Sequence, residues 1–198
     1  PQATITRDVF SKDNIIYKAS PLQKDNFIFG SEEDEKIYGF SGDDEIRGSN
    51  GNDVLYGGKG NDMLDGMGGN DEVKGGFGDD YLLSGPGDDL LQAGRGDDIL
   101  VAHSGFNRLY GGDDNDILVS GKDTDLMIGG NGKDEYHFNQ NFGNDRIIGY
   151  VSGEKIKLFS TGNSDKAKVK QVGRHAVITA ANGSSIKVLR TNTDDLKI

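Results

Sequence analysis

An acidic residue or its amide recurs at every ninth position over a long stretch of the chain. The series begins at Glu35, ends at Asp134 and has Asn107 as its one uncharged member. The other ten positions are all aspartates: Asp44, Asp53, Asp62, Asp71, Asp80, Asp89, Asp98, Asp116, Asp125 and Asp134. Carboxylates are hard oxygen ligands that divalent cations prefer, so this regular spacing indicates a row of cation sites. The alternative is that these aspartates only form turns and carry solvated charge.

The acids belong to a longer repeating pattern. From Gly30 to His137 the chain divides into twelve nonapeptides without an insertion. The first position is always Gly, Ser or Ala, the fourth is Gly in nine repeats, and the eighth is always hydrophobic. The eighth-position residues are Ile37, Ile46, Leu55, Leu64, Val73, Leu82, Leu91, Leu100, Leu109, Leu118, Met127 and Tyr136. Because glycine allows tight turns, each repeat reads as a turn followed by a short strand.

Charge and composition indicate that the repeats need a partner ion. Residues 30–137 hold 25 acids and 8 bases, a net charge of −17, within a chain whose net charge is −11. Only 33% of the 198 residues are hydrophobic, so the hydrophobic core is small. The negative charges of the repeats also repel one another strongly, and this core has to offset that repulsion. The ion that carboxylate and carbonyl oxygens suit best is calcium. Since the chain has no cysteine, disulfides and thiolate metal sites are excluded.

Two repeats match the pattern G-G-x-G-x-D-x-U-x, in which U is a large hydrophobic residue: "GGKGNDMLD" (57–65) and "GGFGDDYLL" (75–83). The sequence therefore resembles the RTX (repeats-in-toxin) family. The resemblance implies an all-β fold, a right-handed parallel β-roll or β-solenoid, with calcium between its turns. Two repeats make one 18-residue coil with a strand on each side, so the repeats predict about six coils. The eighth-position residue points inward.

Three regions are expected along the chain. Residues 30–137 form the roll, and residues 1–29 form a flank whose stretch "DNFIFG" serves as an N-terminal half-coil cap. Residues 138–198 lose the nonapeptide and contain five strand-like stretches, "DRIIGY", "KIKLF", "AKVKQV", "HAVITA" and "SSIKVL". Asn182-Gly183 predicts a hairpin between the last two. This C-terminal region is expected to be an antiparallel cap that closes the open end of the roll.

The sixth-position residues should form two stacks, because a turn lies beside the turn 18 residues later. Asn107 and Glu35 belong to one stack, and the other contains only aspartates. In the family each ion lies between stacked turns and is held by both aspartates and by turn carbonyls. The resemblance thus implies about seven or more calcium ions, at the pairs 44/62, 53/71, 62/80, 71/89, 80/98, 98/116 and 116/134. Pairs that include Glu35 or Asn107 should bind weakly, and 102–128 is expected to be the weakest part of the roll.

The outward positions of one sheet are unusually apolar. Two adjacent columns are expected there, formed by Met63, Tyr81, Ile99 and Ile117 and by Leu83, Val101 and Val119. An exposed apolar patch of this size marks a contact surface. Either the chain's own flanks cover it, or it serves self-association or a partner, unless the assumed register is wrong.

The sequence lacks the motifs of the common catalytic centres. It has no H-E-x-x-H, G-x-S-x-G, P-loop or EF-hand sequence, and no span of apolar residues long enough to cross a membrane. His103, His137 and His175 have no paired nucleophile and are expected to face solvent. We therefore predict no catalytic activity and, beside the acidic repeats, no nucleic-acid binding.

These observations favour a calcium-triggered folding module. By resemblance, it belongs to a bacterial protein, such as a toxin, that is secreted by a type I system and acts outside the cell. The stretch "PQATITRDVF" has no signal-peptide core, so the chain is a fragment or is exported without an N-terminal signal. One alternative is a calcium-dependent adhesin that binds a carbohydrate or a partner. Another is the non-catalytic C-terminal part of a secreted enzyme.

Overall fold

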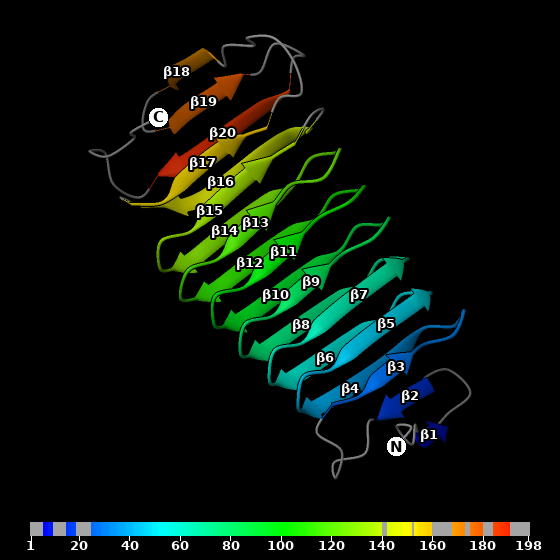
Figure 1. Ribbon diagram of the computed structural model, residues 1–198. Coiled ribbons are helices and arrows are strands. Elements are labelled where there is room, and N and C mark those ends of the chain that lie inside the picture. The colour runs from blue at the N-terminus through cyan, green and yellow to red at the C-terminus, as the bar shows by residue number, and fades with distance from the viewer. Residues whose placement is uncertain are drawn as a thin grey trace.

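The computed structural model describes residues 6–9, 15–18, 25–139, 142–151, 153–159, 168–172, 175–179 and 184–190. These residues form a rod of short β-strands in two facing sheets, with the chain winding from β3 (Phe27–Phe29) at one end to β20 (Ser185–Arg190) at the other (Figure 1). They include no helix that is long and apolar enough to cross a membrane.

The larger sheet has 12 strands. In spatial order they are β1 (Thr6–Val9), β2 (Ile15–Lys18), β4 (Glu35–Ser41), β6 (Val54–Lys59), β8 (Glu72–Phe77), β10 (Leu90–Arg95), β12 (Arg108–Asp113), β14 (Leu126–Asn131), β16 (Asn144–Tyr150), β20 (Ser185–Arg190), β19 (His175–Thr179) and β18 (Lys168–Val172). From β2 to β20 the neighbouring strands run parallel, whereas the outermost strands at both ends pair antiparallel.

The smaller sheet has 8 strands, and every neighbouring pair is parallel. Its order is β17 (Lys155–Leu158), β15 (Glu135–Phe138), β13 (Ile117–Val119), β11 (Ile99–Val101), β9 (Tyr81–Leu83), β7 (Met63–Gly68), β5 (Glu45–Asn50) and β3 (Phe27–Phe29).

The strand register follows the two-repeat coil. Leu91 of β10 lies between Val73 of β8 and Leu109 of β12, each 18 residues away. This confirms the predicted parallel β-roll. The roll has about seven turns rather than six, because β3 precedes the first repeat and β16 and β17 add a further coil after the last one. The sequence pattern did not reveal that coil because it departs from the nonapeptide.

The eighth-position residues form the core of the roll. All twelve, from Ile37 to Tyr136, are fully buried between the two sheets. This row of buried hydrophobic residues, the hydrophobic ladder, extends to Ile28 in β3 and to Ile147 in β16, which are also fully buried. The predicted inward direction of this position is therefore correct, and one hydrophobic side chain from each half-coil supports the turns beside it.

The C-terminal region contains the five predicted strands. Two of them, β16 and β17, join the roll, while β18, β19 and β20 form an antiparallel unit that adjoins β16 through β20. The predicted Asn182-Gly183 turn lies outside the described residues, between the paired strands β19 and β20.

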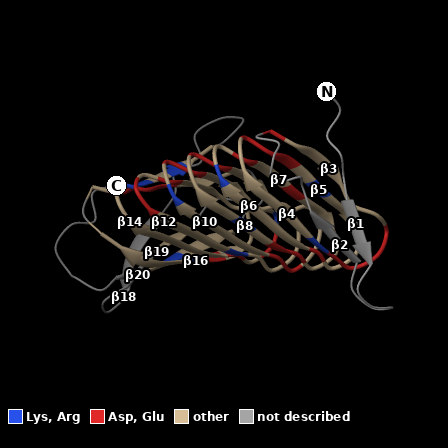
Figure 2. Ribbon diagram, turned by 90° about the horizontal axis from the view of Figure 1, so that it is seen from below, with Lys and Arg blue, Asp and Glu red and all other residues tan. Residues whose placement is uncertain are grey.

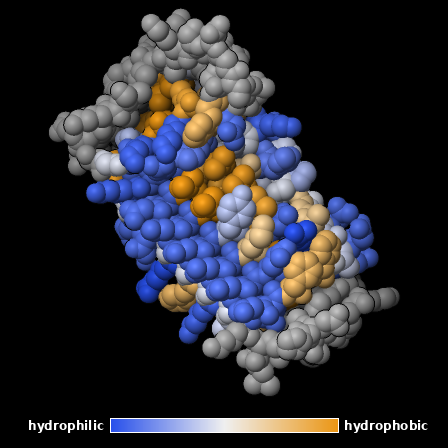
Figure 3. Space-filling view, in the orientation of Figure 1, coloured by the Kyte–Doolittle hydropathy of each residue, from blue (hydrophilic) through white to orange (hydrophobic). Residues whose placement is uncertain are grey.

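The two predicted apolar columns lie on the outer face of the smaller sheet. Met63 pairs with Tyr81, and Ile99 pairs with Ile117, so the assumed register is correct. Met63 and Tyr81 are 40% and 36% exposed, so the described parts of the flanks do not bury them. The other five residues are half-buried. Figure 3 shows an apolar patch over β11 and β13, the strands that contain Ile99, Val101, Ile117 and Val119.

Candidate metal centre

The sixth-position residues are buried although all of them except Asn107 are acidic. All twelve, from Glu35 to Asp134, are at most 3% exposed. Figure 2 shows acidic residues gathered in the turns along the edges where the two sheets meet. Aspartate and glutamate are rarely buried without a partner, because taking a carboxylate out of water is costly. The surroundings of each carboxylate oxygen therefore decide what the turns can bind.

One oxygen of each predicted aspartate holds neighbouring coils in register. Asp53 Oδ1 accepts a hydrogen bond from the Glu35 amide at 2.8 Å, and Asp71 Oδ1 accepts one from the Asp53 amide at 2.8 Å. The same bond, across 18 residues, is made by Asp44, Asp62, Asp80, Asp89, Asp98, Asp116, Asp125 and Asp134. This oxygen satisfies a backbone donor that the turn would otherwise leave unpaired.

The second oxygen has no hydrogen-bond donor. Oδ2 is buried and unpartnered in nine of the ten predicted aspartates: Asp44, Asp53, Asp62, Asp71, Asp80, Asp89, Asp98, Asp116 and Asp134. A row of buried, unpaired carboxylate oxygens is unfavourable unless a cation or a proton neutralises it.

A second oxygen lies close to each of these atoms. A Cβ atom added to Gly39 would lie 2.4 Å from Asp44 Oδ2 and 2.6 Å from the Gly57 carbonyl oxygen. Gly48 has the same surroundings, with Asp53 Oδ2 at 2.4 Å and the Gly66 carbonyl oxygen at 2.6 Å. Carboxylate and carbonyl oxygens thus converge beside the first-position glycine. Hard oxygens of this kind fit calcium.

Burial raises the pKa values of these carboxyl groups. Desolvation raises the pKa of Asp62 to about 6, that of Asp53 to about 7 and that of Asp71 to about 8. The backbone hydrogen bond to each carboxylate opposes this effect, and the negative charges of neighbouring acids in the stack add to it. Without a cation, the stack therefore tends to bind protons near neutral pH.

Side chains alone do not complete a site. In the described part of the chain, no group of three or more His, Asp or Glu side chains is placed to hold one metal ion. Because calcium takes roughly six to eight oxygen ligands, backbone carbonyls would have to supply many of them.

Comparison with known proteins agrees with this arrangement. The sequence profile of the RTX calcium-binding nonapeptide repeat matches four times, over residues 23–55, 38–73, 74–109 and 101–136. Together these matches cover more than half of the 198 residues. The chain belongs to the RTX calcium-binding repeat family.

Other comparisons add little to the family match. No curated protein sequence matches the chain. Among solved structures, the extracellular lipase LipA from Serratia marcescens is similar with 19% sequence identity and a TM-score of 0.34. That match covers 90% of this chain and 40% of the lipase chain, so this chain spans less than half of the lipase's length.

In the turns that contain Asn107 and Asp125, the side chains form hydrogen bonds that the nine aspartates with an unpartnered Oδ2 lack. The Asn107 amide nitrogen donates to the Gly105 carbonyl at 3.2 Å, and its oxygen accepts from the Asp89 amide at 3.1 Å. Asp125 Oδ2, the atom that is unpartnered in the other nine aspartates, accepts from the Gly121 amide at 2.7 Å. Asp125 is therefore the one predicted ligand whose second oxygen already has a donor.

Glu35 also differs from the aspartates. Both of its carboxylate oxygens accept hydrogen bonds from the Ser31 amide at 3.1 Å, and the Ser31 hydroxyl donates to one of them. The longer side chain thus reaches its own turn, and the weak binding expected of pairs that include Glu35 stays a prediction.

Three residues that continue the stacks were missed by the sequence interpretation. Asn26, Asp145 and Glu154 are at most 5% exposed. Asn26 lies 18 residues before Asp44 and donates to its Oδ1 at 2.7 Å, so extending the 18-residue spacing backwards would have found it. Asp145 Oδ1 accepts from the Asp125 amide across 20 residues, and its Oδ2 is unpartnered. Two additional residues in this last coil shift Asp145 and Glu154 out of the ninefold pattern.

The histidines lie outside the two stacks. His103 is exposed. His137 is half-buried on the outer face of β15, where its Nε2 lies 3.1 Å from Glu135 Oε2. His175 belongs to β19, but its side chain lies outside the described residues.

Proposed function

We propose that this chain is a calcium-binding module that folds when calcium fills its turns. The observation that supports the proposal is the row of nine buried aspartates whose Oδ2 atoms have no donor. Each of these atoms would be a calcium ligand, together with carbonyl oxygens such as those of Gly57 and Gly66. The bound ions would neutralise the buried carboxylates of the stacks and reduce the repulsion within a chain of net charge −11.

We assign about seven ions to the stacked aspartate pairs given by the sequence. Each pair joins turns of successive coils, so an ion at that place would link them directly. The pairs 89/107 and 107/125 are left out, because Asn107 is uncharged and Asp125 Oδ2 already accepts a hydrogen bond.

The proposed role depends on the difference in calcium concentration across the cell envelope. Extracellular calcium modules have dissociation constants of roughly 10⁻⁴–10⁻³ M, well above cytosolic calcium. The acidic chain would remain unfolded in the cytosol, suit export by a type I system, and fold outside the cell. Calcium drives folding because it binds the folded state only. The parent protein would be a secreted toxin or a similar protein, and this module would contribute no catalysis to it.

A calcium titration followed by circular dichroism tests this function. In excess chelator we expect a disordered spectrum, and added calcium should produce β structure in a cooperative transition. Magnesium at the same concentration should be far less effective, since it requires a smaller octahedral site. A β-sheet spectrum that persists in excess chelator would contradict the proposal.

A second candidate function is the binding of a partner or of another copy through the two apolar columns. The exposure of Met63 and Tyr81 favours it, as does an adjoining groove of about 430 Å³ lined by Met67, Leu83 and Val101 among others. Replacing Ile99 and Val119 by lysine should weaken self-association or capture of a glycan or membrane partner. If the double variant keeps the oligomeric state and the binding of the calcium-loaded protein, this second function is wrong.

A further inference from the structure

An open groove of about 430 Å³ lies on the outer face of the smaller sheet, beside the two apolar columns. Gly85 lies in this groove between two neighbouring coils. On one side a Cβ atom added to Gly85 would lie 1.6 Å from the Met67 carbonyl oxygen, and on the other Pro86 pairs with Ser104, which follows His103. Because coils are spaced about 4.8 Å apart and glycine has no side chain, the groove has room for about one side chain between Met67 and His103.

The walls of the groove are largely apolar. Leu83 and Val101 pair on β9 and β11 and are half-buried, and Met67 adjoins them in the lining. Aliphatic walls of this kind hold the hydrocarbon part of a ligand by removing it from water. This lining therefore suits an aliphatic stem rather than a hydrated metal ion.

Asp65 adds a carboxylate that has no ion pair. It is the one acid among the described residues that line the groove, and none of them is lysine or arginine. Its Oδ1 accepts from the Met67 amide at 3.1 Å, and no other described residue donates to it or forms an ion pair with it. Arg47, its neighbour on β5, is instead paired with Glu45 at 2.7 Å. Burial raises the pKa of the Asp65 carboxyl group, and the Met67 amide and Arg47 only partly oppose this effect.

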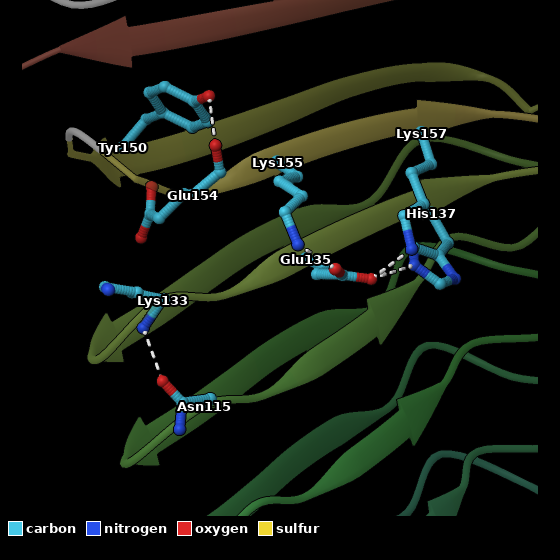
Figure 4. A network of polar contacts seen from close by, with 8 residues as sticks. All are labelled: Asn115, Lys133, Glu135, His137, Tyr150, Glu154, Lys155 and Lys157. Atoms are coloured by element: carbon cyan, nitrogen blue, oxygen red, sulfur yellow. Dashed lines mark hydrogen bonds and ion pairs between the residues drawn. The ribbon is translucent and has the colours of Figure 1, made fainter.

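The acid at the other end of the apolar columns is already neutralised. Glu135 of β15 contacts Lys155, Lys157 and His137 (Figure 4). These contacts lower the pKa of Glu135 to about 2. Of these two acids, only Asp65 is left to pair with a cation from outside the chain.

A ligand for this groove needs a cationic group on an aliphatic stem. Lysine and arginine side chains have this form, since they bury their methylene groups and carry the charge at the tip. The net charge of −11 also attracts basic segments over a distance. An extended protein segment would in addition place its neighbouring apolar residues on the two columns, which a free amine could not cover.

We propose that this groove binds a lysine or arginine side chain from an extended segment of a partner protein. The stem lies against Leu83 and Val101, and the cationic group pairs with Asp65 Oδ2. This site rests on the second candidate function given above, and it defines the basic residue that such a partner provides.

The test compares three short peptides on the whole calcium-loaded chain: acetyl-Val-Lys-Val-amide and its forms with glutamine or glutamate at the centre. NMR signals of the Met67, Leu83 and Val101 methyl groups report both affinity and place of binding. The lysine peptide should shift these signals to saturation. The glutamine peptide should bind about three- to tenfold more weakly, as expected for the loss of one half-buried ion pair, and the glutamate peptide should bind most weakly. Equal affinities, or shifts only outside the groove, would overturn the proposal.

Asp65→Asn keeps the oxygen that accepts from the Met67 amide but removes the charge. It should weaken the lysine peptide by the same factor and leave the glutamine peptide unchanged, in a chain whose circular dichroism spectrum matches the wild type. Glu135→Gln is the matched control, because Glu135 lies on the same outer face but is already paired. This variant should bind the lysine peptide as the wild type does. An unchanged affinity in Asp65→Asn, or an equal loss in both variants, would overturn the proposal.

A second copy of the chain is the other occupant to distinguish. If the methyl signals of the groove shift with protein concentration while the lysine peptide does not bind, a second copy fills the groove and the proposal is wrong. Failure of the second candidate function has a different result. The Ile99 and Val119 double variant would then keep its oligomeric state and partner binding, while the preference of the wild type for the lysine peptide would still support the site at Asp65.

Discussion

At the residue scale, the two oxygens of each repeated aspartate have separate functions. Oδ1 accepts a backbone hydrogen bond that sets the register of neighbouring coils, and Oδ2, which has no donor except in Asp125, is the oxygen that we propose as a calcium ligand. The spacing of the aspartates indicated the second function. It could not reveal the first, because the bond joins residues 18 apart and depends on the direction of each carboxylate.

Asp80→Asn should separate these two functions. The amide oxygen can still accept from the Asp62 amide, whereas the amide nitrogen replaces the unpartnered Oδ2. We expect the calcium midpoint of folding to rise, because the calcium-loaded state loses about 1–3 kcal/mol.

Asp79→Asn is the control for this change. Asp79 is the exposed neighbour, and its Oδ1 accepts from the Asp97 amide. If both variants shift the midpoint equally in a fluorescence or dichroism titration, the effect is one of surface charge and the assignment of Asp80 as a ligand is wrong.

Asn107→Asp should create a cation site at the turn where Asn107 now forms hydrogen bonds. The change removes the donor to the Gly105 carbonyl and places a charge beside Asp125. The ion count at saturation should therefore increase, and the midpoint should change with it. An unchanged ion count together with an unchanged midpoint would show that the uncharged residue does not limit calcium binding there.

At the element scale, the 18-residue coil is the unit of structure, and each half-coil buries one hydrophobic residue between the two sheets. The eighth position was predictable from sequence because one side chain in each half-coil must face inward. The extra coil at β16 and β17 could not be predicted, because its two additional residues disrupt the ninefold spacing. Its strands nevertheless continue the parallel pairing of both sheets. The exposure of Met63 also could not be predicted, since it depends on where the flanks lie.

Leu91→Ala should destabilise the calcium-loaded roll without removing an ion. Leu91 is fully buried in β10, and a Leu to Ala change in a core costs about 2–5 kcal/mol. Thermal unfolding in saturating calcium should show a lower midpoint, while equilibrium dialysis should give the wild-type ion count. A reduced ion count would mean that the ladder and the metal sites are not separate supports.

At the scale of the whole molecule, acidic stacks inside an acidic chain make the ion-free fold sensitive to pH. The pKa values of Asp53, Asp80 and Asp116 are raised to about 7, 7 and 8 by desolvation and by neighbouring acids. Because the folded state binds these protons more tightly than the unfolded state, they stabilise the fold fully below pH about 4. That contribution is lost as the pH rises through about 6 to 8.

In metal-free buffer, the chain should therefore gain β structure as the pH is lowered from 8 to 4. Calcium and protons compete for the same carboxylates, so calcium affinity should rise over the same range from pH 6 to 8. Circular dichroism and calorimetric titrations measure these two effects. Calcium affinity that does not change with pH would show that the buried carboxylates are not the ligands.

The most direct test of the account is the location of the ions in a crystal structure of the calcium-loaded chain, determined with anomalous scattering. We predict ions within about 2.3–2.6 Å of the Oδ2 atoms of the nine unpartnered aspartates, and none between Asn107 and Asp125. If the ions instead lie only at exposed acids such as Asp79, or if none is bound, the assignment of the buried stacks as the calcium centre is wrong.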